Sequence, residues 1–138
     1  MPGYSGTPLP KKLGIKDGLR VALLHVPAEV KSDLQKALAK CPCARLDAGN
    51  LDFIFLFVKS QAALESELQG AARALAPAGM LWIAWPKKRS GVVTDLVEDM
   101  VREAGLAAGL VDIKVCAVTD VWSGLKFVIP VKQRLKKH

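Results

Sequence analysis

The sequence predicts an α/β fold: a single Rossmann-like domain, built as a three-layer sandwich around a mostly parallel sheet of five to six strands that ends in an antiparallel hairpin. Apolar segments of strand length alternate with segments of helical periodicity, which is typical of helices packed on a parallel sheet. Residues 51–58, LDFIFLFV, lack polar alternation, as expected for a strand covered on both faces. The strand-like segments 113–118 and 125–131, joined by 119–124, favour a terminal hairpin.

Length and composition indicate one globular domain. The chain has 138 residues, and domains most often contain roughly 100–150. We expect residues 1–138 to form that domain, with 1–18 as an irregular arm and 132–138 as a basic tail. No apolar run approaches the ~20 residues of a membrane span, and the N-terminus lacks the apolar core of a secretory signal. We therefore expect a cytoplasmic protein without membrane contact.

The first half of the chain contains three predicted strands and one helix. Residues 20–26, RVALLHV, form a short buried strand, and Pro27 opens a helix that runs to about residue 40. A brief strand over 43–47, CARLD, and the apolar strand over 51–58 follow. The apolar face of the helix comprises Val30, Leu34, Ala37 and Leu38.

The second half continues the alternation. Ser60 is the predicted N-cap of a helix to about residue 76, which the sequence Pro77-Ala78-Gly79 ends. Residues 80–85 form the next buried strand. A helix is then predicted over 93–104 by apolar residues at helical spacing: Val93, Leu96, Val97, Met100, Val101 and Ala104.

The strand over 80–85 runs directly into Lys87-Lys88-Arg89-Ser90-Gly91, which we call the basic corner. Ligands of open α/β sheets bind at the carboxyl ends of the parallel strands, where this segment is predicted to lie. The following helix would add free N–H groups and a favourable dipole, with Ser90 as its cap and Gly91 open to a ligand. The basic corner therefore predicts a site for phosphate or carboxylate; a solvated loop is the alternative.

Two further segments are predicted at the same edge of the sheet. One follows the strand over 51–58, and the other lies in the predicted final loop, where a tryptophan is either a wall for a planar ligand or a core residue. Together with the basic corner they predict a phosphate- or nucleotide-like small molecule as partner. The candidate binding residues in these segments are Lys59, Ser60, Trp122, Ser123 and Gly124.

Parts of the sequence resemble class I methyltransferases, Rossmann-like enzymes that use S-adenosylmethionine. The similarity lies in KLGIKDGLRVALL (12–24), LDFIFLFV (51–58) and ALAPAGMLWIAW (74–85). The resemblance implies a Rossmann-like fold and, where the cofactor loop is present, that cofactor.

The segment that would hold the cofactor departs from that family. Methyltransferases follow their first strand with a glycine-rich loop, which lets the backbone approach the cofactor, but residues 25–29 here are HVPAE. Asp47, about 20 residues on, is either a ribose-binding acid or a solvated turn residue. The chain is also short for the fold and lacks one strand–helix unit. We therefore expect no cofactor, with S-adenosylmethionine bound weakly or not at all.

A closer resemblance is to a family of small bacterial proteins identified only as a domain of unknown function. It spans nearly the whole chain and implies no established activity. The motifs that carry it are YSGTPL (4–9), KLGI (12–15), WPKK (85–88), Ser90-Gly91, TDL (94–96) and WSGL (122–125).

Other function classes find little support in the sequence. Four of the net seven positive charges lie in the tail 132–138, without an aromatic-rich surface, so we do not expect a nucleic-acid partner. Cys41 and Cys43 lack a second ligand pair, so we expect no metal. His25 is either a structural residue or a general base.

Two hypotheses of different classes follow. The first is a non-catalytic binding or interaction module, which the missing glycine loop favours. The second is a divergent, methyltransferase-like transferase acting on a phosphorylated or nucleotide-like ligand, which the basic corner favours. The sequence leaves open whether the protein is an enzyme and which oligomer it forms.

Overall fold

Five strands form one open sheet in the computed structural model, which describes residues 7–134. Their order across the sheet is β1-β2-β3-β5-β4; the first three are parallel, and β5 is antiparallel to both β3 and β4. The predicted mostly parallel sheet with a terminal antiparallel hairpin is confirmed. The strands are β1 Val21–Leu24, β2 Leu51–Phe57, β3 Leu75–Pro86, β4 Val111–Ala117 and β5 Trp122–Val128.

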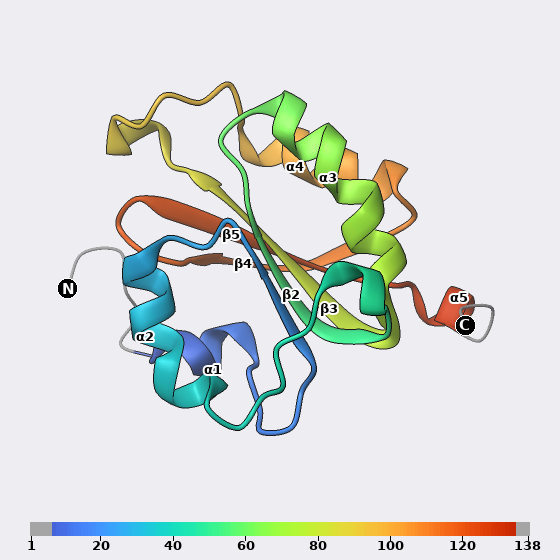
Figure 1. Ribbon diagram of the computed structural model, residues 1–138. Helices are drawn as coiled ribbons and strands as arrows, with labels where there is room; N and C mark the ends of the chain where they lie inside the picture. The colour runs from blue at the N-terminus through green and yellow to red at the C-terminus, as the bar shows by residue number, and fades with distance from the viewer. Residues whose placement is uncertain (1–6, 135–138) are drawn as a thin grey trace.

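Helices cover both faces of this sheet, which makes the predicted three layers (Figure 1). One layer contains α1 Leu9–Leu13 and α2 Ala28–Leu38, and the opposite layer contains α3 Gln61–Ala74 and α4 Glu98–Ala107. The short α5 Val131–Arg134 follows β5. Within residues 7–134, no helix has the length and apolar character needed to cross a membrane.

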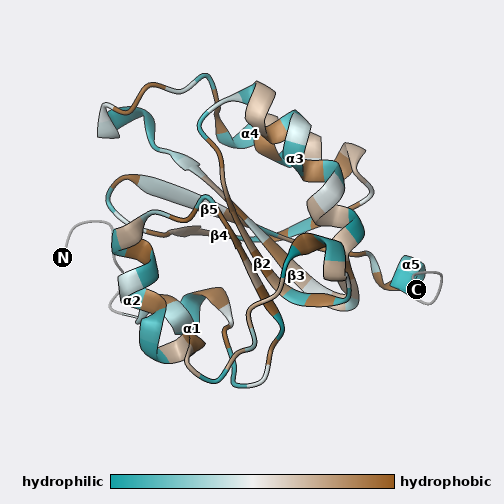
Figure 2. Cartoon of the chain, viewed as in Figure 1, coloured by the Kyte–Doolittle hydropathy of each residue, from teal (hydrophilic) through white to brown (hydrophobic). Residues whose placement is uncertain are grey.

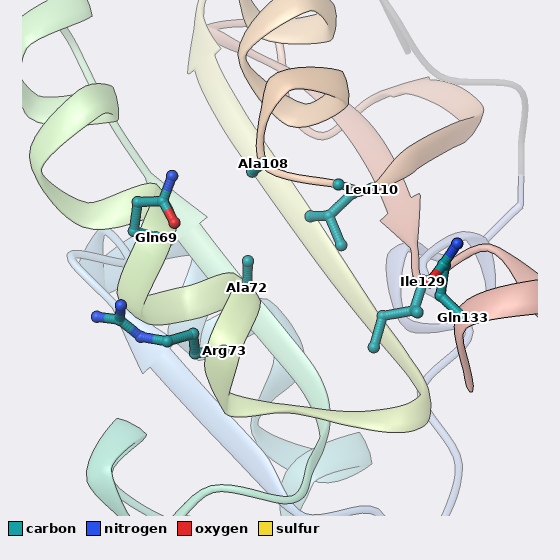
Figure 3. Close-up of a pocket in the computed structure, with 8 residues that line it drawn as sticks. Gln69, Ala72, Arg73, Ala108, Leu110, Ile129 and Gln133 are labelled. Atoms are coloured by element: carbon teal, nitrogen blue, oxygen red, sulfur yellow. The ribbon is translucent and has the colours of Figure 1, made fainter. Parts of the chain in front are cut away.

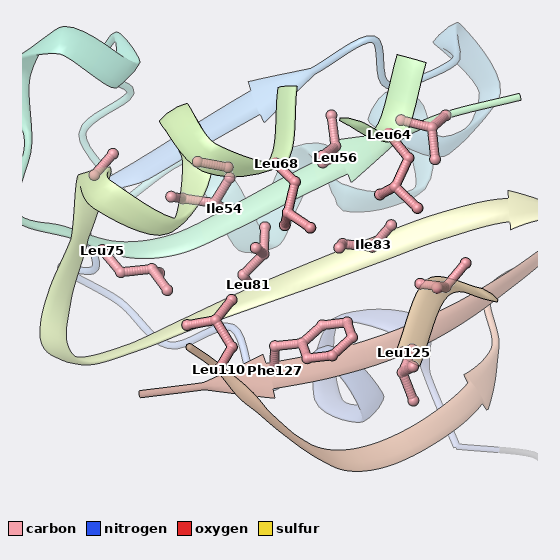
Figure 4. Packing of buried hydrophobic residues seen from close by; sticks show 14 of the residues in the cluster. Ile54, Leu56, Leu64, Leu68, Leu75, Leu81, Ile83, Leu110, Leu125 and Phe127 are labelled. Carbon is pink, nitrogen blue, oxygen red and sulfur yellow. The ribbon is translucent and has the colours of Figure 1, made fainter. Parts of the chain in front are cut away.

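β2 is the centre of the core because both of its faces are covered. Phe53, Phe55 and Phe57 pack in the cluster beneath α1 and α2, whereas Ile54 and Leu56 pack in the cluster beneath α3 and α4 (Figure 4). All five side chains are at most 3% exposed. The central strands are accordingly the most continuously hydrophobic part of the fold (Figure 2), as two-sided burial of a parallel strand requires.

The N-terminal arm, 1–18, is predicted to be irregular, but part of it forms α1, which docks on the sheet. Leu9 and Leu13 are buried, and the indole Nε1 of buried Trp82 donates a hydrogen bond of 2.9 Å to the Leu13 carbonyl. This bond satisfies the polar atom of a core tryptophan and fixes α1 against β3. The rest of the predicted arm and tail, residues 1–6 and 135–138, lies outside the described residues.

The predicted strand over 43–47 is reduced to a single parallel bridge between Val21 and Cys43. The chain then turns through the 3-10 helix Leu46–Ala48 before β2 begins. β1 is therefore nearly an edge strand, and the strand that would extend the sheet beyond it is almost absent.

The helix predicted over 93–104 is wrong in its first half, since α4 begins only at Glu98. Leu96 is buried, but Val93 is 92% exposed, so the apolar periodicity does not describe one helical face. Thr94 Oγ1 accepts a hydrogen bond from the Leu96 amide. Such side-chain bonds compete with helical ones, and the β-branched residues at 92–94 favour extended backbone.

Arg102 fastens α4 to the edge strand β4. Its Nε donates to Asp112 Oδ2 at 2.9 Å, and its other nitrogens contact Glu98 and Asp99 in the first turn of α4. The hydrogen bond from Arg102 holds the pKa of Asp112 below its ordinary value. One guanidinium thus holds the start of α4 in place, which matters for the site below.

Gly105 is where α4 approaches the sheet most closely, and it supports a stability prediction. A Cβ there would overlap the ring of Phe127, whereas a Cβ at Gly70 in α3 would meet nothing within 4 Å among the described residues. We expect Gly105→Ala to destabilise the protein by about 1–3 kcal/mol through overpacking. Gly70→Ala should stabilise it by up to about 1 kcal/mol through helix propensity. Urea unfolding of both variants measures these opposite signs; equal effects would contradict the close packing of α4.

Candidate functional site

The carboxyl ends of β1, β2 and β3 meet at one edge of the sheet, and two hollows open there. The larger, the aromatic hollow, has a volume of about 670 Å³ and lies over the ends of β1 and β2. The smaller, the basic hollow, has a volume of about 360 Å³ and lies beyond the end of β3. Because β5 is antiparallel to β3, its first residues reach the same edge: Trp122 pairs with Pro86, and Ser123 with Trp85.

Trp122 and Phe57 form an apolar wall of the aromatic hollow. Their rings lie edge to face with centroids 4.8 Å apart, and Trp122 is only 6% exposed. Trp122 is therefore a core residue, as one of the two readings predicted, and it also lines the hollow. An edge-to-face pair of this kind presents a rigid surface suited to a planar group.

Charged groups of both signs surround that wall. His25, Glu29, Lys59 and Glu67 line the aromatic hollow, and His25 Nε2 lies 2.7 Å from Glu67 Oε1. The hollow is therefore polar at its rim without a strong excess of either sign. His25 is among the few described non-glycine residues with positive φ, at 60°, and this bend ends β1 two residues before the predicted end of the strand.

The basic hollow is lined by Lys87, Lys88 and Arg89 of the basic corner. Within residues 7–134, none of these three side chains forms an ion pair. The other lining residues are Trp85, Pro86, Leu96, Val97, Glu98 at the start of α4, and Ser123. The Glu98 carboxylate accepts a 2.6 Å hydrogen bond from Arg102, which partly neutralises it.

The local structure of the basic corner differs from the prediction. Lys88–Ser90 is a 3-10 turn that Gly91 ends with φ 82°, and α4 starts seven residues later. Ser90 does not cap α4: its hydroxyl donates to the Lys87 carbonyl and accepts from the Val92 amide. Residues 87–97 loop out from β3 and then return to the start of α4 (Figure 1). The first turn of α4 therefore still contributes to the hollow, through Glu98.

Lys59 and Ser60 have separate roles. Lys59 lines the aromatic hollow, whereas the Ser60 hydroxyl caps α3 by accepting from the Ala63 amide at 3.1 Å. Asp95, from the returning loop, accepts from the Gln61 amide at 2.8 Å. A carboxylate of the chain itself therefore occupies the N-terminus of α3.

Trp122, Ser123 and Gly124 begin β5, so their predicted position in a loop is wrong. Gly124 is buried, and a Cβ there would lie 2.9 Å from Val118 Cγ2 and 3.3 Å from Trp82 Cε3. Its role is close packing of the hairpin on the core, while Ser123 faces the basic hollow and Trp122 the aromatic hollow.

A family model described as "Protein of unknown function (DUF3052)" matches residues 10–131. The chain belongs to the DUF3052 family. A comparison with curated proteins finds no match.

Solved methyltransferase structures share the fold of this DUF3052 protein at low sequence identity. Precorrin-6y C5,15-methyltransferase from Geobacter metallireducens is 12% identical, with a TM-score of 0.58 over 88% of this chain and 85% of the other. A TehB-like SAM-dependent methyltransferase from Corynebacterium glutamicum is 11% identical, with a TM-score of 0.54 over 92% and 90%. Magnesium protoporphyrin IX methyltransferase from Synechocystis, with bound SAH, is 12% identical, with a TM-score of 0.52 over 88% and 78%. The DUF3052 chain is thus a Rossmann-like, methyltransferase-like module in fold.

The residues of this DUF3052 protein do not fit S-adenosylmethionine in the way that a glycine loop does. Pro27 and Glu29 line the aromatic hollow, and a carboxylate at this rim would be unfavourable for a cofactor that itself carries a carboxylate. Asp47 lies in the turn before β2, at the opposite edge of the sheet, and is exposed beside Arg45. It cannot reach a ribose in the hollow, because the strand that would carry an acid there is only the Val21–Cys43 bridge.

Other parts of the DUF3052 structure are weaker candidates for a site. One such candidate is a hollow of about 300 Å³ at the amino edge of the parallel strands (Figure 3). It lies between α5 and the C-terminal ends of α3 and α4. Its lining includes Gln69, Arg73 and Gln133, but ligands of open α/β sheets bind at the carboxyl edge. Within residues 7–134, no group of three or more His, Cys, Asp or Glu side chains is placed to hold a metal ion.

The backbone of His25 supports a prediction for the rim of the aromatic hollow. Its φ of 60° lies in the left-handed region, which costs about 1–2 kcal/mol for a residue with a Cβ. Both His25→Gly and His25→Ala remove the contact with Glu67. The difference between their free energies of unfolding therefore reports the cost of the left-handed backbone at this position. We expect the glycine variant to be the more stable by about 1 kcal/mol in urea unfolding. At Lys36 in α2, the alanine variant should instead be more stable than the glycine variant, because alanine has the higher helix propensity. If His25→Gly and His25→Ala are equally stable, the bend at His25 is not strained.

Proposed function

We propose that this chain binds a small molecule that carries a phosphate or carboxylate group, which Lys87, Lys88 and Arg89 hold. The observation that carries the proposal is that three cations line one hollow and, within residues 7–134, form no ion pair, while the acid that shares the hollow, Glu98, is bound to Arg102. Charge-assisted hydrogen bonds from lysine and arginine to an anion are shorter and stronger than neutral ones. An unpaired triad of this kind is suited to an anionic group of the ligand.

The start of α4 supports the same ligand chemistry. Val97 precedes the helix, and no side chain in the described part of the protein caps it. The Met100 amide donates to the Val97 carbonyl, which leaves the amides of Glu98 and Asp99 without an acceptor within residues 7–134. Free amides and the helix dipole favour an anion. The two acids of this first turn, Glu98 and Asp99, are both bound to Arg102, which reduces their repulsion of a bound anion.

The aromatic hollow supports a planar group on the same ligand. Trp122 lines this hollow, and the next residue, Ser123, lines the basic hollow. In the proposed mode a ring packs against Trp122 and Phe57, with Lys59 at its rim, while the anionic group reaches the basic corner. A nucleotide-like molecule has both parts.

A transferase of the methyltransferase-like type is the second candidate, and the fold of the solved methyltransferases favours it. In such a transferase the basic corner would anchor a phosphorylated substrate. His25 would then be a candidate general base, since Glu67 holds its ring over the hollow at 2.7 Å. The lack of fit to S-adenosylmethionine makes the binding module the better supported of the two.

The anion site predicts the effect of neutralising the basic corner. We expect adenosine 5′-monophosphate to bind at least tenfold more tightly than adenosine, because only the former carries phosphate. In the variant Lys87→Gln/Lys88→Gln/Arg89→Gln this difference should disappear, while the free energy of unfolding changes by less than about 1 kcal/mol. Isothermal titration and urea unfolding measure both quantities.

A matched control removes three exposed cations at the other edge of the sheet: Lys16→Gln/Lys36→Gln/Lys40→Gln. It should keep the preference for the phosphorylated ligand. If both variants lose this preference equally, the attraction is nonspecific, and the result contradicts the anion site. A large loss of stability in the basic-corner variant would show that the three side chains are structural.

The aromatic hollow also gives a prediction for S-adenosylmethionine. We expect this molecule to bind weakly or not at all in calorimetry, because the 25–29 segment carries Pro27 and Glu29 where a glycine loop would be needed. A low-micromolar dissociation constant would reverse the order of the two candidate functions and favour the transferase.

A further inference from the structure

A second basic region lies on the face of the β4–β5 hairpin that α1 covers. A hollow of about 470 Å³ opens there between α1 and β4, and Lys11, Lys12, Lys114 and Cys116 are among its lining residues. Lys126 of β5 lies directly opposite Lys114 across the hairpin. We call Lys11, Lys12, Lys114 and Lys126 the lysine cluster.

Two ammonium groups of the lysine cluster, those of Lys114 and Lys126, lie at the end of α1, and that of Lys12 lies at the end of β4. Lys114 Nζ donates to the Lys12 carbonyl at 3.2 Å, and Lys12 Nζ donates to the Ala117 carbonyl at 3.3 Å. Lys126 Nζ lies 4.0 Å from the position a Cβ would have at Gly14, the residue that follows α1. Two of these long side chains are thus anchored at the backbone, which lowers the entropy cost of holding a ligand.

The pairing of Lys114 with Lys126 is unfavourable in the isolated protein. Like charges directly opposite each other on neighbouring strands repel. Burial and the charge of Lys114 lower the pKa of Lys126. Within residues 7–134, Lys11, Lys114 and Lys126 form no ion pair. The described part of the chain therefore holds these three cations near one another without an acid paired to any of them.

Cys116 does not supply the missing negative charge. Burial raises the pKa of its thiol, although Lys12, Lys114 and Lys87 act in the opposite direction, so the thiol is neutral near pH 7. An external anion would relieve the repulsion that the fold leaves in place.

We propose that the lysine cluster is a second anion site, separate from the basic corner, which binds the phosphate group of a small molecule. Its size supports this class of ligand, since a hollow of about 470 Å³ accommodates a small molecule. Among the described residues that line it none is aromatic, so this part of the hollow offers bases of a single-stranded nucleic acid no stacking surface. Pyrophosphate is the simplest probe, because its two phosphate groups can contact ammonium groups from both α1 and the hairpin.

The test is a titration of the full chain with pyrophosphate, followed by the backbone amide resonances of Gly14, Cys116 and Ala117. We expect saturable shifts at these amides. The double variant Lys114→Gln/Lys126→Gln should weaken this binding at least tenfold. It should also be no less stable than the wild type, because the substitution removes a repulsive pair, so loss of binding does not reflect unfolding. The matched control Lys36→Gln/Lys40→Gln removes two exposed lysines elsewhere and should bind as the wild type does.

The basic-corner variant separates this site from the proposed function. Lys87→Gln/Lys88→Gln/Arg89→Gln should abolish shifts at Glu98 and Asp99 but retain those at Gly14 and Cys116. Two results would overturn the second site. One is that the shifts at the lysine cluster persist in the double variant Lys114→Gln/Lys126→Gln. The other is that no shifts occur in the wild type at millimolar pyrophosphate. Binding of a single-stranded oligonucleotide that pyrophosphate does not displace would overturn the small-molecule assignment.

Discussion

The two-sided burial of β2 is the constraint on which the rest of the structure depends. A strand with both faces covered needs a helical layer above and below and a paired neighbour on each side. Its register is decided by shape rather than polarity, because Phe53, Phe55 and Phe57 face α1 and α2, while the smaller Ile54 and Leu56 face α3. A slip of one residue would exchange these two faces and misfit both layers.

That register determines where the candidate site lies. Parallel pairing of β1, β2 and β3 brings their carboxyl ends to one edge, so His25, Lys59 and the basic corner meet there although they are far apart in sequence. The antiparallel direction of β5 is equally necessary. A parallel last strand would start at the opposite edge, whereas β5 starts beside Pro86 and delivers Trp122 and Ser123 to the two hollows.

The sequence was sufficient for features that follow from local pattern. Unbroken apolarity predicted β2, the N-cap of α3 at Ser60 was read from its residue type, and the three consecutive cations located the basic corner at a strand end. Remote partners decided the features that were mispredicted. The extended segment before α4 depends on Asp95 reaching the amide of Gln61, 34 residues away in sequence. Helical spacing cannot reveal that contact, because Leu96 alone satisfies the demand for a buried side chain in this segment.

Contacts between residues that are brought together by helix packing or strand register could not be predicted from the sequence, for the same reason. His25 meets Glu67 only because α3 returns across the end of β1, and Lys114 meets Lys126 only in the observed hairpin alignment. No periodic pattern in the sequence predicts either contact. A lone histidine and two separated lysines carry no information about each other until the fold is known.

The nearly absent strand beyond β1 connects the fold to the proposed binding mode. In the methyltransferase-like arrangement that side of the sheet would contribute an acid to the ligand, but here it contributes one bridge at Val21. The rim of the aromatic hollow carries charges of both signs, with Glu29 and Glu67 near β1 and α3 and Lys59 at the end of β2. Beyond β3, Lys87, Lys88 and Arg89 line the basic hollow without an ion pair in residues 7–134, and the one acid in its lining, Glu98, is bound to Arg102. The excess of positive charge at this edge therefore lies beyond β3, where it attracts an anionic group. In the proposed mode this excess orients the ligand, with its phosphate towards α4 and its ring towards Trp122.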